Sequence, residues 1–219
     1  MALPLHSKII NKLARETLKP LGVTRKGQSR LWYDDNDWFL TLIEFQPSRW
    51  SKGTYLNIGI CWLWYPKDTF SFQLSYRENA FVEFETEEQF SVEVQKFVDI
   101  AKERVLSLRE ELSSPEMAKN FVLENTVGSK DNVWASLNRA MICIYAADYE
   151  SMEQFLQDVI DSDDYRDWAE DVKLFAKKIL VLAPEARIKF IENSITESRA
   201  LKGLVEKKIV LASISASPA

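Results

Sequence analysis

The sequence predicts an α+β fold: an antiparallel sheet of about five strands flanked by helices, followed by a C-terminal helical bundle. Two observations carry this prediction. Between residues 29 and 85, apolar side chains recur with the period of two that is typical of strands. From Thr86 onward, the apolar period lengthens to that of helices. Glycine and proline number only 6 and 7, which disfavours long flexible linkers between these parts.

The composition is that of a soluble globular protein, with 46% hydrophobic and 28% charged residues. A net charge of −5 argues against nucleic acid as the partner. No apolar run is long enough to predict a membrane span, and the charged N-terminal segment does not resemble a signal peptide. Cys61 and Cys143 are expected to be reduced and buried. A cytoplasmic protein is therefore expected.

An amphipathic helix is predicted for residues 5–19, because Leu5, Ile9 and Leu13 recur at helical spacing and Pro20 and Gly22 follow. Its outer face and the next loop are basic. This charge is typical either of a solvated surface or of a patch for phosphate or an acidic partner. The basic residues are Lys8, Lys12, Arg15, Lys19, Arg25, Lys26 and Arg30.

Residues 29–45 are predicted to form a hairpin that turns at 34–37, where Asp and Asn tolerate left-handed backbone. Its second strand is apolar on both faces, which indicates that both are covered. A polar elbow follows, and then a strand over residues 55–64, in which Gly59 leaves room for either a packed helix or a ligand. A half-exposed strand is expected at residues 70–76 and a short one at 80–85.

A capping box at Thr86–Gln89 predicts the start of a long helix that ends at Leu112 and packs across the sheet. Ser114 and Pro115 fit the cap and first position of the next helix. Further helices are predicted at 115–126, 132–147, 149–162, 166–182 and 185–204, joined as antiparallel hairpins. We therefore expect a sheet domain at 1–112, a helical bundle at 113–210 and a frayed tail at 211–219.

Sequence motifs for catalysis are missing. A single histidine, His6, lies near the N-terminus. No His/Cys cluster with zinc spacing occurs, and we expect no Ser-His-Asp or Cys-His pair. No glycine-rich phosphate loop occurs. We therefore assign no catalytic residue and no metal ligand, and we expect no cofactor.

The elbow is the better candidate for a site, because it joins two stiff strands and combines hydrogen-bond donors, a cation and aromatic rings. Gly53 and Ser51 are expected to leave its backbone open to a ligand. In the alternative interpretation, Trp50 folds back as a lid on the core and Arg49 pairs with Glu44. The candidate binding residues are Arg30, Gln46, Ser48, Arg49, Trp50 and Tyr55.

Two segments resemble a bacterial family known as a domain of unknown function with the label 4304. They are L-K-P-L-G-V-x-R-K-G (18–27) and E-F-Q-P-S-R-W-S-K-G-T-Y-L-N-I-G (44–59). Members are similar in an opening helix and a Q-x-S-x-W elbow before an N-x-G strand. The matching residues here are Gln46, Ser48, Trp50, Asn57 and Gly59. The resemblance covers residues 5–85 and implies no activity, substrate or cofactor.

Two functions remain open. The first is a non-catalytic protein-interaction module of the bacterial cytoplasm with a protein partner, which a flat surface at the elbow would favour. The second is a binding or enzymatic site for a small polar or phosphorylated ligand at residues 46–55. A cleft that holds Arg30, Arg49, Trp50 and Tyr55 together would favour the second.

Overall fold

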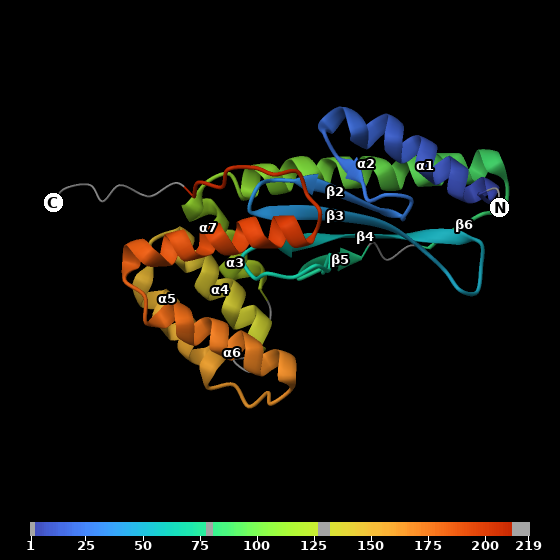
Figure 1. Cartoon of the computed structure of the whole chain (residues 1–219). Helices are drawn as coiled ribbons and strands as arrows, with labels where there is room; N and C mark the ends of the chain where they lie inside the picture. The colour runs from blue at the N-terminus through green and yellow to red at the C-terminus, as the bar shows by residue number, and fades with distance from the viewer. Residues whose placement is uncertain (1–2, 78–80, 127–131, 212–219) are drawn as a thin grey trace. The chain divides into compact units, whose positions relative to one another are not determined.

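A six-stranded antiparallel sheet and seven α-helices make up the part of the chain that the computed structural model describes, which is residues 3–77, 81–126 and 132–211 (Figure 1). The predicted α+β class is confirmed. Contacts between residues divide the chain into two units. Unit 1 contains the residues up to Cys61 together with Phe70–Glu110. Unit 2 contains Trp62–Thr69 together with the residues from Glu111 onward.

The sheet of unit 1 has the order β1-β2-β3-β4-β5, and β6 pairs with β4. The register places Leu31 opposite Glu44 and Asn57 opposite Arg77. Asp37 adopts the left-handed backbone expected at the turn, with a φ of 67°. The strands are β1 (Thr24–Arg25), β2 (Leu31–Asp35), β3 (Phe39–Pro47), β4 (Gly53–Trp62), β5 (Leu74–Arg77) and β6 (Val82–Glu83).

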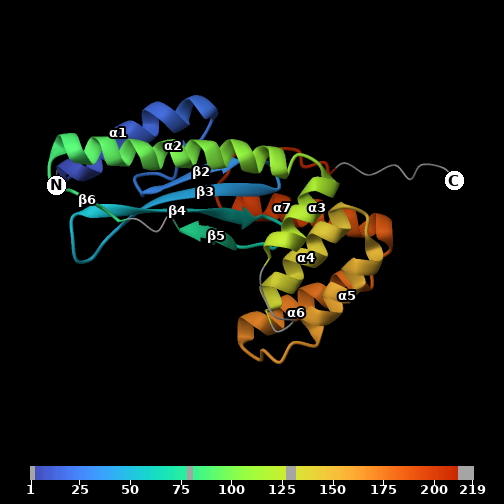
Figure 2. The same ribbon diagram turned by 180° about the vertical axis from the view of Figure 1, so that it is seen from behind.

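One face of this sheet, here called the helix face, is covered by α1 (Leu5–Leu18) and α2 (Glu87–Glu111), as both views show (Figures 1 and 2). Side chains alternate between the faces, so the opposite side, here called the second face, carries Tyr33, Gln46, Asn57 and their neighbours. Leu5 is 46% exposed rather than part of the core. The strand residues of the helix-face core are Trp32, Ile43, Phe45, Leu56, Ile58 and Val82.

Helix α2 begins as its sequence predicts. The Thr86 hydroxyl accepts a hydrogen bond from the Gln89 amide at 3.2 Å, and the Gln89 side chain accepts one from the Glu85 amide at 3.4 Å. Near its end, Arg109 donates two hydrogen bonds to the buried carboxylate of Asp34 on β2, at 2.5 and 2.9 Å. This bidentate pair fixes α2 to the helix face.

The strand expected at residues 70–76 forms only from Leu74 onward, because the aromatic residues before it pack on the second face. Phe70 contacts the ring of Tyr33 at 5.6 Å between centroids. A Cβ on Gly59 would lie 2.8 Å from the ring of Phe72 and 2.5 Å from the carbonyl oxygen of Leu74. The room at Gly59 is therefore filled by residues 72–74, not by a helix or a ligand.

Unit 2 is built from five helices and the Trp62–Thr69 segment. Consecutive helices α3 to α6 pack against one another, and α4 also contacts α7, which matches the predicted helix hairpins (Figure 2). Ser114 and Asn132 cap α3 and α4 by accepting the amides of Met117 and Ala135. The helices are α3 (Pro115–Asn125), α4 (Val133–Tyr145), α5 (Tyr149–Ile160), α6 (Asp167–Leu180) and α7 (Pro184–Leu201).

The boundary was expected between residues 112 and 113, whereas the contacts group residues 62–69 and also residues 111–112 with unit 2. Leu211, expected to fray, is buried, and its amide donates to Glu192 at 3.1 Å. The rest of the expected tail, 212–219, lies outside the described residues. The expectation that the sheet part and the helical part are separate domains stays a prediction.

Among the helices described, none combines the length and apolar character needed to cross a membrane.

Candidate functional site

A polar network lies on the second face of the sheet, where β3, β4 and β5 run side by side. The Asn57 amide nitrogen donates to Glu44 and to Gln46, at 3.0 Å each. Arg77 donates to the Asn57 carbonyl oxygen at 2.8 Å and also to Gln46. Its guanidinium lies over the ring of Tyr55, 5.1 Å from the centroid. Asn57 thus links three strands through side chains that alternation places on one face.

A hollow of about 340 Å³ opens beside this network. Hydrogen bonds within the protein already engage Arg77, Asn57 and Gln46, so the network is braced before any ligand arrives. It offers hydrogen-bonding groups but no nucleophile paired with a base. Within the described residues, no three His, Cys, Asp or Glu side chains gather as a metal site would require. The lining residues are Gln46, Asn57, Phe72, Ser75, Tyr76 and Arg77.

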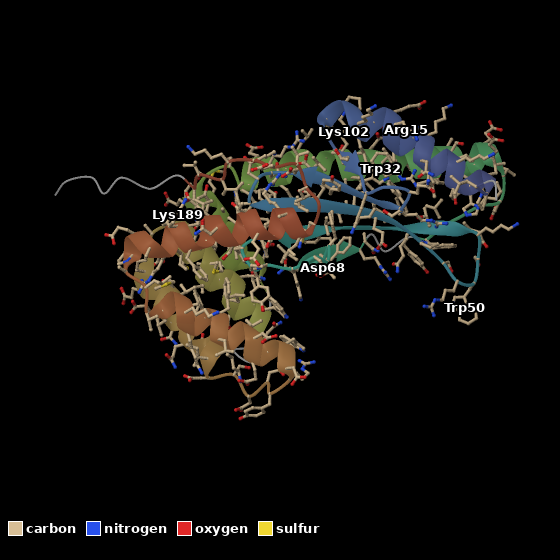
Figure 3. All side chains as sticks on the ribbon, viewed as in Figure 1. Arg15, Trp32, Trp50, Asp68, Lys102 and Lys189 are labelled. Carbon is tan, nitrogen blue, oxygen red and sulfur yellow. The ribbon has the colours of Figure 1, made fainter. Side chains whose placement is uncertain are left out.

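The β3–β4 connection, residues 48–52, projects beyond the sheet and presents Trp50 at its tip (Figure 3). The Trp50 side chain is 94% exposed, so it is not a lid on the core. The Ser48 hydroxyl accepts hydrogen bonds from the Trp50 and Ser51 amides at 3.1 and 3.3 Å, which braces the turn. We call the exposed residues Arg49, Trp50 and Lys52 the hairpin tip.

We expected Gly53 to leave the backbone open to a ligand, and this prediction is wrong. A Cβ at this position would lie 2.2 Å from the carbonyl oxygen of Val82 and 2.5 Å from the ring of Phe81. Gly53 pairs with Glu83 of β6, so the missing side chain lets β6 approach β4. The glycine therefore completes the sheet.

The six candidate binding residues do not share one cleft. Gln46 and Tyr55 meet at the network on the second face, while Ser48, Arg49 and Trp50 form and brace the hairpin connection. Arg30 lies apart on the helix face, where it donates to the Ser7 hydroxyl at 3.3 Å. Burial there lowers the pKa of Arg30.

Sequence reasoning missed Asn57 and Arg77 as members of the network. One signal was present for Asn57, a polar amide inside an otherwise apolar strand, because a buried amide needs hydrogen-bond partners. Arg77 gave no comparable signal, since its position opposite Asn57 depends on the pairing of β4 with β5.

His6 belongs to α1, which covers the helix face, and the charges of Arg30 and Lys52 act on its ring. Its ring contacts those of Phe84 and Phe90, at 6.0 and 6.5 Å between centroids. Burial, and then the positive charges of Arg30 and Lys52, lower the pKa of His6 below its ordinary value of 6.5. The folded state therefore disfavours the protonated imidazole.

We expect His6 to make stability depend on pH. As the pH falls below 6.5, the unfolded chain takes up a proton on His6 that the folded protein accepts only at lower pH. The unfolded state then binds more protons than the folded state. The free energy of unfolding therefore decreases as the pH is lowered through this window. Urea denaturation at pH 7.5 and 5.5 should give a smaller acid-induced loss for His6→Gln than for the parent. Equal losses in both proteins would contradict this assignment.

Comparison with known proteins places the chain in a family. No curated protein and no solved structure matches the chain. The model of a family described as "Domain of unknown function (DUF4304)" matches residues 14–139, which is more than half of the 219 residues. This range covers the whole sheet and α2, and it extends past residue 85, where the resemblance was expected to end, into α3 and α4. The chain therefore belongs to the DUF4304 family, a family defined by a domain of unknown function.

Proposed function

We propose that the chain is a non-catalytic protein-interaction module of the bacterial cytoplasm, and that the hairpin tip contacts its protein partner. The observation that carries this proposal is Trp50, a large apolar ring with 94% of its surface exposed. Tryptophan and arginine are the residues most enriched at the energetic centres of protein interfaces. Arg49 adjoins Trp50, so the tip presents both kinds of anchor together.

The hairpin tip is also suited to binding by its rigidity and charge. The two hydrogen bonds to the Ser48 hydroxyl hold the backbone beside Trp50, which lowers the ordering cost of association. Arg49 and Lys52, within two residues of Trp50 in the sequence, carry two positive charges. A complementary partner surface therefore offers an apolar pocket rimmed by carboxylates.

The cysteines support the proposed compartment. Cys61 and Cys143 are both buried, and neither is part of a disulfide. Burial, followed by the nearby charge of Asp148, raises the pKa of the Cys143 thiol to about 12, so it stays protonated and inert near neutral pH. Thiols outside disulfides are typical of proteins in reducing compartments.

A small polar or phosphorylated ligand remains a second candidate. Its support is the hollow of about 340 Å³ beside Arg77 and Asn57. Arginine suits phosphate and carboxylate groups. In this alternative, Gln46 and Tyr55 position Arg77 through the hydrogen bond and the ring contact described above.

The test is affinity purification from source cells with the parent chain, Trp50→Ala and Tyr165→Ala. Tyr165 serves as the control, because its side chain is 76% exposed and belongs to unit 2, whereas the hairpin belongs to unit 1. We expect a protein retained by the parent and by Tyr165→Ala to be lost with Trp50→Ala. Once that protein is purified, Trp50→Ala should weaken its binding by at least about 30-fold, the effect of a major interface residue.

Two results would count against this proposal. One is a partner bound equally by all three proteins. The other is a bound small molecule that is lost with Arg77→Gln but kept with Trp50→Ala, which would favour the second candidate. Thermal melts should be alike for the parent, Trp50→Ala and Tyr165→Ala, because neither ring is buried.

A further inference from the structure

A second hollow, of about 510 Å³, lies within unit 2 between α6, α7 and the 62–69 segment. Its volume is within the range of small-molecule sites. Three aromatic rings line it and touch in series: Tyr65 meets Phe175 at 5.0 Å between centroids, and Phe175 meets Phe190 at 5.2 Å. The whole lining is Tyr65, Pro66, Asp171, Phe175, Lys178, Phe190, Asn193, Ser194 and Glu197.

Helical spacing explains why these residues face one another. Asp171, Phe175 and Lys178 follow the i, i+4, i+7 pattern that places side chains on one face of α6. Phe190, Asn193 and Glu197 repeat the i, i+3, i+7 pattern along α7. Tyr65 is held by a perpendicular contact with Trp134, at 5.1 Å between centroids. The rings are therefore fixed before a ligand enters.

The charges of the lining are unbalanced. Asp171 and Glu197 form no ion pair within residues 3–77, 81–126 and 132–211. Lys178 is the one cation among the lining residues, which leaves one net negative charge. Burial, and then the carboxylate of Asp171, raise the pKa of Tyr65, so its hydroxyl stays neutral.

We propose that this hollow binds a small organic cation carrying an ammonium or trimethylammonium group. Such a cation gains both from the faces of aromatic rings and from nearby carboxylates. An anion would meet the two carboxylates with only Lys178 to offset them. The described residues include no group of three ligands suited to a metal ion. Three rings, two unpaired carboxylates and sufficient volume therefore specify an organic cation.

The probe is choline chloride, titrated into the ¹⁵N-labelled full-length protein at constant ionic strength. Its neutral isostere, 3,3-dimethylbutan-1-ol, has the same shape without the charge. We expect choline to shift the Trp134 indole and Asn193 side-chain amide signals saturably, and the alcohol to leave them in place. Equal binding of the alcohol would overturn the proposal, since the hollow would then be an apolar pocket only. The absence of a saturable shift would overturn it as well.

Charge variants sharpen the test. Asp171→Asn should weaken choline binding about two- to fivefold, the effect of one partly exposed charge pair. Lys178→Gln should strengthen binding, because it removes the opposing cation. Glu150→Gln changes the net charge as Asp171→Asn does, but it lies on the exposed surface of α5 and should change nothing. An Asp171→Asn effect no larger than that of Glu150→Gln would contradict the assignment. All three positions are exposed, so folding should be retained.

Discussion

Trp64→Ala should lower the free energy of unfolding by about 3–5 kcal/mol, the usual cost of truncating a buried aromatic side chain. The Trp64 ring is 1% exposed and stacks on Trp62, with 4.7 Å between centroids and 14° between planes. Its indole nitrogen donates to the Asn138 side-chain oxygen at 3.0 Å. Truncation therefore creates a cavity and also leaves a buried amide oxygen on α4 without its donor.

Trp50→Ala is the matched control, because the chemical change is the same and the ring is 94% exposed. We expect its effect to stay within about 0.5 kcal/mol. Urea denaturation should be followed by far-UV circular dichroism, since both variants lose a fluorophore. Similar losses for the two variants would mean that the 62–69 segment is not packed as described.

Asp34→Ala should cost about 2–3 kcal/mol. Removing one partner of a buried ion pair strands the other, which typically costs about 3–5 kcal/mol. We expect less here because the Arg109 side chain is 34% exposed and still donates to the Leu21 carbonyl oxygen at 2.7 Å. Urea denaturation of the full chain measures the loss.

Glu93→Ala provides the comparison for this ion pair. Glu93 pairs with Lys96 on the exposed surface of α2, where the two side chains are 39% and 61% exposed. We expect a change of at most about 0.5 kcal/mol, because water screens such pairs. A loss equal to that of Asp34→Ala would show that the buried pair has no special role.

The helices were predictable from the sequence because their ends are determined locally. The hydroxyls of Thr86 and Ser114 each accept the amide three residues further along, and Pro115 opens its helix, so a few residues suffice to place each boundary. The apolar stripe of α2 likewise needs only spacing. Phe90, Val94 and Val98 recur at helical intervals in the sequence, and all three are buried.

The strands and the site were harder because they depend on long-range pairing. Phe70 and Phe72 alternate as strand residues do, yet Phe72 packs at Gly59, a residue thirteen positions earlier in the chain. The register of β2 with β3 likewise places Arg30 on the helix face, away from Gln46 and Tyr55. Nothing adjacent to these residues in sequence specifies that register.

The inclusion of Trp62–Thr69 in unit 2 has a consequence for how this chain could be rearranged by recombination or engineering. The polypeptide passes from one unit to the other after Cys61, after Thr69 and again after Glu110. Neither unit is therefore one continuous stretch of sequence, and a single cut in the chain cannot separate the two. A graft of the helices alone would leave Trp64 behind and Asn138 without its donor. Transfer to another scaffold requires the Trp62–Thr69 segment to be supplied as a separate insert.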